Sequence, residues 1–361
     1  MKVVTVVGNR PQFVKAAAVS SKLREHAAEV LVHTGQHYDD EMSAVFFAEL
    51  GVPPPARELR LGTGSNTEQT ARMLSALATV LEQERPDCLL VYGDTNSTLA
   101  GGLAAAQAQI PVAHVEAGMR SFDRAMPEEL NRVLTDHLSS LLLCSSEPSA
   151  AHLRAERVAG RIEVVGDVMV DVALLVQPRA RQDDAPLREA GVRPGEYALA
   201  TAHRAGNVDD PARLRRLVGV LLALPLPVVL PLHPRTEVRL EAAGLLEELL
   251  AADHVRVTPP LGYLAFTALL TRAAAMLTDS GGVQKEAYLA GVPCVTLRDT
   301  TEWTETVDLG WNVLVDLDTD AALAALDRPV PTERPPLYGD GQAGGRVVAA
   351  LLGAFGNSET R

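Results

Sequence analysis

The sequence predicts an α/β protein of two doubly wound, Rossmann-like domains in tandem. Short apolar runs alternate with longer Ala-, Leu- and Arg-rich stretches, a rhythm typical of a parallel sheet covered by helices on both faces. The rhythm is interrupted once, by the polar and proline-bearing segment 178–194, and then begins again. With 361 residues, 47% of them hydrophobic, the chain can fill two cores and exceeds what one compact core usually reaches.

The predicted strands form two series, one on each side of this interruption. The first series is VVTVVG at 3–8, VLVHTG at 30–35, CLLVYGD at 88–94, IPVAHVE at 110–116, LLLCS at 141–145 and IEVVGD at 162–167. The second is YALAT at 197–201, PVVLPLHP at 227–234, HVRVTP at 254–259, AAAMLTDS at 273–280, PCVTLR at 293–298 and NVLVD at 312–316. We therefore place an N-terminal domain at 1–166 and a C-terminal domain at 167–339, with a last helix near 340–361 that packs back on the first domain.

Polar or glycine residues follow nearly every predicted strand. They are Gly8 to Arg10, Gly35 to His37, Gly93 to Thr95, His114 to Glu116, Thr201 to Arg204, His233 to Arg235 and Asp279 to Gly282. Ligands of doubly wound sheets bind beyond the carboxyl ends of the strands. If both domains present these edges to one cleft, a single site collects all of these side chains.

The segment TDSGGVQKEAYLAGVP, residues 278–293, has the pattern of an anion-binding turn. A strand ends at Thr278, Gly281 and Gly282 allow close approach of a ligand, and a helix then begins whose first N–H groups are free to bind phosphate. Ser280 as an ordinary helix cap is an equally good interpretation from spacing alone. Glu286, one turn further along, is placed to meet a sugar hydroxyl or is a surface acid favoured by the helix dipole.

The segment GNRPQFVK, residues 8–15, is a second strand–turn–helix, with Pro11 at the first helical position. Arg10 and Lys15 would flank the start of that helix and could meet a diphosphate. Taken singly, each is more often a solvated surface group.

Titratable residues follow several of the other strands. Asp94 could be a simple helix cap, and His203 with Arg204 could be a solvated strand end. The helix dipole alone would explain Glu128 and Glu129, which stand in the first turn of a helix beginning at Pro127. It does not explain Glu116, which comes directly after a buried-looking strand. A histidine facing several carboxylates across a cleft would form a titratable cluster.

Composition argues against several classes of protein. A net charge of −13 argues against a nucleic-acid surface, and no run approaches the ~18 apolar residues of a membrane span. The three cysteines are far apart without a CxxC pair, so we expect reduced core thiols, and no metal.

Without a GxGxxG turn the chain has no signature of a nicotinamide site, so we expect no cofactor. We expect a cytoplasmic protein.

Nine motifs in order resemble the non-hydrolysing UDP-N-acetylglucosamine 2-epimerase family. They are GNRPQFVK, HTGQHYD, VYGDTNSTLAG, HVEAGMRS, MPEELNR, AHRAGN, TDSGGVQKEA, LRDTTEWTE and YGDGQA, and they span residue 1 to about 350. The resemblance implies a glycogen-phosphorylase (GT-B) type fold, a cleft between the domains, a UDP-sugar as ligand and a homodimer. The implied site residues are Asp94, Glu116, Glu128 and His203 for catalysis, Arg10, Lys15 and Arg204 for substrate, Phe266 for uracil, Ser280, Gly281 and Gly282 for phosphate, and Glu286 for ribose.

The implied reaction interconverts UDP-GlcNAc and UDP-ManNAc. Because no nicotinamide site is evident, loss of UDP to a 2-acetamidoglucal followed by re-addition is the remaining route to inversion at C2. That route needs a diphosphate cradle, a base and an acid, and exclusion of water. Alternatives are the same reaction on UDP-2,3-diacetamido-2,3-dideoxyglucuronate, a hydrolysing epimerase that releases ManNAc and UDP, a GT-B glycosyltransferase, and a binding protein without turnover.

Three departures from the family pattern concern the choice of sugar. Trp303 stands where bacterial members commonly have an arginine, Ala205 to Asn207 lack a glutamate, and the loop from Glu116 to Glu128 is about two residues shorter than in the enteric pattern. The phrases AGMRSFDRAMPEELNR and TTEWTETVDLGWNVLV look closer to archaeal members and to diacetamido-glucuronate epimerases. The segment 36–42 corresponds to a stretch linked to allosteric UDP-GlcNAc binding in bacterial members, and we do not expect that activation here.

Overall fold

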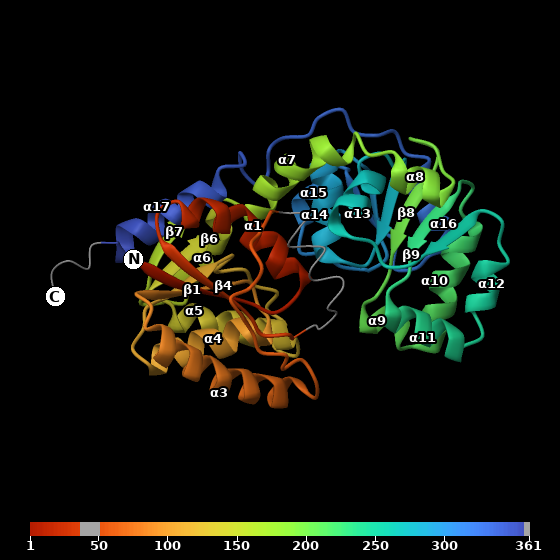
Figure 1. Ribbon diagram of the computed structural model, residues 1–361. Helices are drawn as coiled ribbons and strands as arrows, with labels where there is room; N and C mark the ends of the chain where they lie inside the picture. The colour runs from red at the N-terminus through yellow and green to blue at the C-terminus, as the bar shows by residue number, and fades with distance from the viewer. Residues whose placement is uncertain (37–50, 357–361) are drawn as a thin grey trace. The chain divides into compact units, whose positions relative to one another are not determined.

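A computed structural model of the chain describes residues 1–36 and 51–356 (Figure 1). It consists of two compact units. Unit 1 is residues 1–174 together with the segment from 338 onward, and unit 2 is residues 175–337. Each unit is built on one parallel sheet with helices, which confirms the predicted α/β fold class of two doubly wound domains. The division between units falls after Leu174, inside helix α7 (Val168–Ala180), whereas we expected the boundary at 166, just before that helix begins.

The sheet of unit 1 has seven parallel strands in the order β3-β2-β1-β4-β5-β6-β7. The strands are β1 (Lys2–Val7), β2 (Ala28–His33), β3 (Arg57–Glu58), β4 (Cys88–Tyr92), β5 (Val112–Val115), β6 (Leu141–Cys144) and β7 (Arg161–Val164). The strand order reverses between β1 and β4. That switch point is where a doubly wound sheet opens a crevice at its carboxyl edge.

The helices of unit 1 connect these strands, and the last helix of the chain also belongs to this unit. They are α1 (Arg10–Arg24), α3 (Asn66–Glu84), α4 (Asn96–Gln107), α5 (Pro127–Leu138), α6 (Glu147–Ala155), most of α7, and α17 (Ala343–Phe355). Helix α17 packs on α1, and a Cβ on Gly344 would lie 2.1 Å from the carbonyl oxygen of Ala18. Asp171 accepts hydrogen bonds from the first N–H groups of α17 and so fixes the returning segment to α7.

Unit 2 repeats the design with six parallel strands in the order β10-β9-β8-β11-β12-β13. The strands are β8 (Ala198–Thr201), β9 (Val228–Pro231), β10 (Val255–Thr258), β11 (Ala275–Thr278), β12 (Cys294–Thr296) and β13 (Asn312–Leu314). The helices are α8 (Ala185–Ala190), α9 (Ala205–Val208), α10 (Pro211–Ala223), α11 (Pro234–Ala242), α12 (Leu246–Leu250), α13 (Tyr263–Leu270), α14 (Gly281–Ala290), α15 (Thr304–Asp308) and α16 (Thr319–Leu326). Its switch point lies between β8 and β11.

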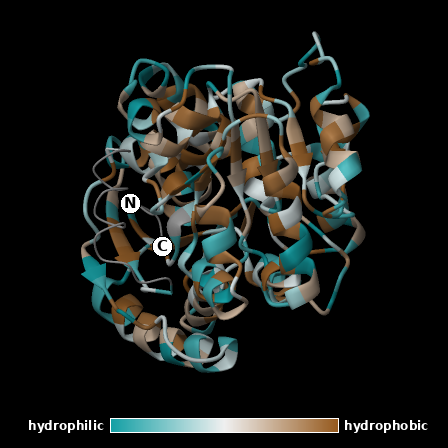
Figure 2. Ribbon diagram, turned by 90° about the vertical axis from the view of Figure 1, so that its right-hand side faces the viewer, coloured by the Kyte–Doolittle hydropathy of each residue, from teal (hydrophilic) through white to brown (hydrophobic). Residues whose placement is uncertain are grey.

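The inner strands are mostly apolar on both faces because helices cover both sides of each sheet. Figure 2 shows hydrophobic residues concentrated on the strands, whereas the helices alternate between apolar and polar faces. In unit 1, Val4, Val6, Leu89 and Val91 pack against Leu77 of α3. Burial of this kind, at roughly 25 cal/mol per Å² of apolar surface, is the main stabilising term of each unit.

The three cysteines are free and buried in these cores. Burial raises the pKa of the Cys88, Cys144 and Cys294 thiols to about 12, so they are unreactive thiols at neutral pH. Within residues 1–36 and 51–356, no helix is both long and apolar enough to cross a membrane. The same residues contain no group of three or more His, Cys, Asp or Glu side chains arranged to hold a metal ion.

Candidate active site

At the switch point of unit 1, the turn after β1 and the turn after β4 are joined through one buried side chain. Gln12, near the start of α1, accepts a hydrogen bond from the Gly8 N–H at 2.7 Å and donates to the Tyr92 carbonyl at 2.7 Å. Asn9 caps α1 by accepting from the Gln12 N–H. The loop that starts α1 is therefore held against the end of β4, which brings Lys15 on the next turn of α1 toward that end.

Lys15 forms an ion pair with Glu116, the residue that follows β5. Both side chains are mostly buried, with 15% and 11% of their surfaces exposed. Burial by itself would lower the pKa of Lys15, but the carboxylates of Glu116 and Asp94 outweigh it and raise that pKa above its ordinary value. The lysine is therefore a fixed cation at neutral pH. Of the residues predicted from sequence, Lys15, Asp94 and Glu116 are brought together here.

Glu116 is held in an unusual backbone conformation. Its φ is +70°, in the left-handed region that residues with a side chain rarely occupy, and Gly93 and Gly118 on the flanking turns are left-handed as well. Such a conformation costs on the order of 1–3 kcal/mol and persists only where the surroundings fix it, which is common at functional sites. A Cβ placed on Gly93 would lie 3.2 Å from Lys15 Nζ and 3.3 Å from Glu116 Oε2, so glycine leaves room for the pair.

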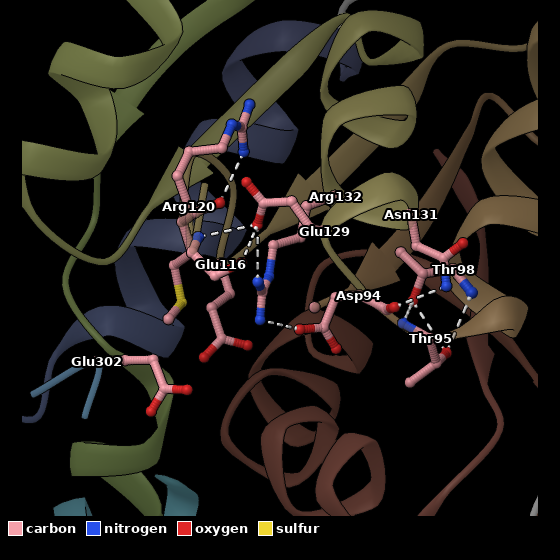
Figure 3. A network of polar contacts seen from close by, with 12 residues as sticks. Asp94, Thr95, Thr98, Glu116, Arg120, Glu129, Asn131, Arg132 and Glu302 are labelled. Atoms are coloured by element: carbon pink, nitrogen blue, oxygen red, sulfur yellow. Dashed lines mark hydrogen bonds and ion pairs between the residues drawn. The ribbon is translucent and has the colours of Figure 1, made fainter. Parts of the chain in front are cut away.

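Asp94 is paired with an arginine that the sequence analysis did not select. Arg132 on α5 contacts the Asp94 carboxylate at 2.5 Å and the Glu129 carboxylate at 3.1 Å (Figure 3). Burial would lower the pKa of Arg132, but Asp94 and Glu129 raise it. The sequence signal for Arg132 was its position three residues after Glu129, a spacing at which acidic and basic residues meet on one helix face.

The two glutamates that begin α5 have different environments. Glu129 is buried and accepts hydrogen bonds from the Ser121 N–H and hydroxyl, both at 2.9 Å, and from the Phe122 N–H at 3.0 Å. Glu129 is the first-turn acid that we expected, and its hydrogen bonds also hold the loop between β5 and α5. Glu128 is exposed, and its side chain has no hydrogen bond or ion pair with another residue that the structure describes. Its catalytic role stays a prediction.

At the switch point of unit 2, a buried carboxylate fixes the end of β8. Asp279, directly after β11, accepts from the backbone N–H groups of His203 at 3.1 Å and Arg204 at 3.0 Å, and from the Asn207 side chain at 3.2 Å. The His203 ring is 42% exposed and stacks on His233 with ring centroids 5.5 Å apart. Asp279 thus places His203 and Arg204 beside the turn that leads into α14.

Two arginines and a glutamate lie beside the N-terminus of α14. Ser280 stands at the cap position, but its side chain makes no capping hydrogen bond, so capping does not account for it. Glu302 is contacted by Arg298 at 3.1 Å and by Arg204 at 3.7 Å. Burial would raise the pKa of Glu302, but these two arginines lower it. The first N–H groups of the helix favour an anion, and Arg204 lies beside them.

Trp303 lies against this same turn. Its indole N–H donates to the Gly281 carbonyl at 2.7 Å, and Lys285 Nζ lies 4.7 Å from the centre of its ring. A Cβ on Gly281 would lie 3.2 Å from Glu302 Oε2, whereas Gly282 is open. A side chain at 281 would therefore require a small shift of Glu302.

Four further predictions concern residues that lie away from the contacts described above or outside the described part of the chain. Phe266 is buried among the apolar residues of α13 and neighbouring strands, so its contact with uracil stays a prediction. Glu286 is half-buried on α14. The Arg10 side chain and residues 37–42, which include most of the segment linked to allosteric binding, lie outside the described residues.

The fold and the two switch points define the class of protein. Two doubly wound units, each with a switch point at the carboxyl edge of a parallel sheet, form the GT-B-like fold of the UDP-GlcNAc 2-epimerases of known structure. The family model described as UDP-N-acetylglucosamine 2-epimerase matches residues 21–352. The chain belongs to this family, which confirms the resemblance found in its motifs.

Individual relatives agree over nearly the whole chain. The chain is 45% identical over 354 residues to a UDP-N-acetylglucosamine 2-epimerase homolog of Methanococcus maripaludis, covering 97% of this chain and 99% of that protein. It is 46% identical over 363 residues to the UDP-2,3-diacetamido-2,3-dideoxy-D-glucuronate 2-epimerase of Pseudomonas aeruginosa, with the same coverage. The crystal structure of Methanocaldococcus jannaschii UDP-GlcNAc 2-epimerase in complex with UDP-GlcNAc and UDP matches with a TM-score of 0.89 and 39% identity, over 97% of this chain and 99% of that one.

Proposed function

We propose that this protein inverts C2 of a UDP-2-acetamido sugar, interconverting UDP-GlcNAc and UDP-ManNAc without net hydrolysis. The observation that carries the proposal is the cluster of Asp94 and Glu116 around the buried cation of Lys15. Two carboxylates at adjacent strand ends supply the base and acid that C2 inversion requires. Family membership supports epimerase activity, and the choice of sugar and of route is our inference.

The proposed route is elimination followed by re-addition. The C1–O bond breaks with its electron pair moving to the β-phosphate of UDP, and the positive charge that develops at C1 acidifies the hydrogen on C2. A carboxylate removes that proton, which leaves a 2-acetamidoglucal and UDP. Protonation of C2 from the opposite face and return of the phosphate oxygen to C1 complete the inversion. No electron is transferred to an external acceptor, so the route needs no redox cofactor.

Each unit contributes a different part of this chemistry. We assign proton transfer to Asp94, Glu116 and Glu128 of unit 1, and stabilisation of the departing phosphate to Arg10, Lys15 and His203. We assign UDP binding to unit 2, with Ser280, Gly281, Gly282 and Arg204 at the phosphates, Glu286 at the ribose and Phe266 at the uracil. The positive charge at the start of α14 supports this assignment, because the leaving group is a diphosphate anion.

A second candidate is the same inversion on UDP-2,3-diacetamido-2,3-dideoxyglucuronate. The observation that favours it is the 46% identity to the Pseudomonas aeruginosa enzyme of that name. The reaction at C1 and C2 would be unchanged, and the two substrates differ only at C3 and C6. The candidate homodimer and the cytoplasmic location are further proposals, and light scattering of the purified protein tests the first.

The experiment is incubation with each UDP-sugar in D2O, followed by NMR. Deuterium at C2 together with formation of UDP-ManNAc is the result expected with UDP-GlcNAc. Free ManNAc would indicate a hydrolysing enzyme instead. Transfer of sugar only when an acceptor is added would indicate a glycosyltransferase. Exchange only with the diacetamido-glucuronate substrate would select the second candidate, and Glu116→Gln protein serves as the inactive control.

A further inference from the structure

A buried network lies under the two carboxylate-bearing turns of unit 1. It contains His114 of β5, Asp136 of α5 and Arg120 of the connecting loop, and none of these side chains is more than 1% exposed. Asp136 lies 2.8 Å from His114 Nδ1 and 2.7 Å from Arg120 Nη1. Arg120 continues to Glu156 with contacts of 2.7 and 2.6 Å. Asp136 thus joins His114 and Arg120 away from solvent, and Glu156, which is 28% exposed, extends the network toward the surface.

This network is bonded to the backbone of both turns. His114 Nε2 lies 2.7 Å from the carbonyl oxygen of Gly93, the residue before Asp94. Asp136 accepts from the N–H of Gly118 at 3.2 Å, two residues after Glu116. Gly93, Glu116 and Gly118 have φ values of +61°, +70° and +79°. Left-handed backbone persists where surrounding contacts over-determine it, and these two hydrogen bonds are such contacts.

The same contacts define the hydrogens on His114. A carbonyl oxygen only accepts, so Nε2 must carry a hydrogen toward Gly93. Burial would raise the pKa of Asp136, but His114 and Arg120 lower it. The Asp136 carboxylate thus meets His114 Nδ1 and Arg120, and Arg120 continues to Glu156.

We propose that His114 is a positioning residue: together with Asp136 it locks the turns at 93 and 116–118 and so aligns Asp94 and Glu116. The kinetic consequence rests on the proposed function of these two carboxylates. His114 itself is fully buried and acts through the backbone. Its removal should therefore slow the chemical step and leave the affinity for UDP unchanged.

The test compares His114→Phe, which keeps a ring in the core and removes both hydrogen bonds, with His33→Phe. His33 is a buried histidine on β2 of the same sheet and serves as a matched control for the change in packing. We expect His114→Phe to lower kcat for C2 exchange by at least about tenfold relative to the control, with an unchanged Kd for UDP in calorimetry. His114→Gln, which restores an N–H donor, should recover part of the loss. Equal kcat values for the two Phe variants would overturn the proposal.

The hydrogen bond from His114 to Gly93 is tested without any assay of activity. In protein labelled with 15N-histidine, long-range 1H–15N spectra should show a hydrogen on His114 Nε2, the atom that faces the Gly93 carbonyl. A His114 Nε2 without a hydrogen would contradict the proposal. If the wild type exchanged no C2 proton of any UDP-2-acetamido sugar, the proposed function would fail by itself. The positioning role would then be decided by this spectrum and by a crystal structure of His114→Phe, in which an unchanged φ at Glu116 would count against it.

Discussion

The switch points of units 1 and 2 share the same strand–turn–helix geometry and carry opposite chemistry. In unit 1, the turns after β4 and β5 place the carboxylates of Asp94 and Glu116 around Lys15. In unit 2, the buried carboxylate of Asp279 binds backbone N–H groups, and arginines gather near the start of α14. The fold determines where each site forms. The residues that follow the strands are the reason why we assign proton transfer to one site and anion binding to the other.

The largest expected effect comes from neutralising the carboxylates of unit 1. Asp94→Asn and Glu116→Gln should each lower turnover by about 10²–10⁴-fold, since each removes a group that we assign to proton transfer. The affinity for UDP, measured by calorimetry, should change by no more than about twofold because unit 2 binds UDP. Unchanged turnover in both variants would remove the assignment. A large loss of UDP affinity would instead show that unit 1 also binds UDP, contrary to the roles that we assign to the two units.

The second prediction concerns the carboxylate of unit 2, which we expect to serve structure rather than proton transfer. Asp279→Ala leaves the N–H groups of His203 and Arg204 buried without an acceptor, at a cost of roughly 1–3 kcal/mol each. We expect the free energy of unfolding to fall by about 3 kcal/mol in urea denaturation. Asp253→Ala, an exposed aspartate of the same unit, is the control and should change little. A stable Asp279→Ala protein that has lost turnover would assign Asp279 to catalysis instead.

Much of this arrangement could be predicted from the sequence, because strand ends and switch points follow from local patterns. Apolar runs of four to six residues define the strands, and the polar residues after them reach the same edge of a parallel sheet. This reasoning placed Lys15, Asp94 and Glu116 in one site. It also placed Arg204 beside the turn at 280–282 in unit 2.

The contacts between elements could not be predicted in the same way. Glu128 and Glu129 are adjacent first-turn acids, and only the rotation of α5 against the loop at 121–122 decides which of them is buried. His114 stands inside a strand, where its periodicity matches that of an apolar residue. Its partner Asp136 is 22 positions away, and no local spacing connects the two. Such pairs become visible only when the helix is docked on the sheet.

The third prediction compares the contributions of Glu129 and Glu128 to the free energy of unfolding. Burial would raise the pKa of Glu129, but hydrogen bonds from Ser121, Arg132 and Phe122 lower it below its ordinary value. A lowered folded pKa gives stability that is present above the unfolded value of about 4.3 and is lost as pH falls through the folded pKa. Glu129→Gln should therefore cost about 1–2 kcal/mol at pH 7 and progressively less below pH 4. Glu128→Gln should change the free energy of unfolding by less than about 0.5 kcal/mol at either pH.

The smallest effect is expected from the positive charge of unit 2. Arg204→Ala leaves Glu302 paired with Arg298 alone, so the start of α14 loses one positive charge while the helix N-terminus remains. We expect the affinity for UDP to fall about tenfold, which corresponds to about 1.4 kcal/mol, and the loss to shrink at high salt because Arg204 is partly exposed. Calorimetry at two salt concentrations measures both effects.

Arg216→Ala removes an exposed arginine that contacts the Asp316 carbonyl, and it is the matched control for net charge. Equal losses in the two variants would mean that long-range charge, rather than a local anion site, attracts UDP. A local loss confined to Arg204→Ala would strengthen the contrast with unit 1, where removing a charge is expected to change the rate and spare the affinity.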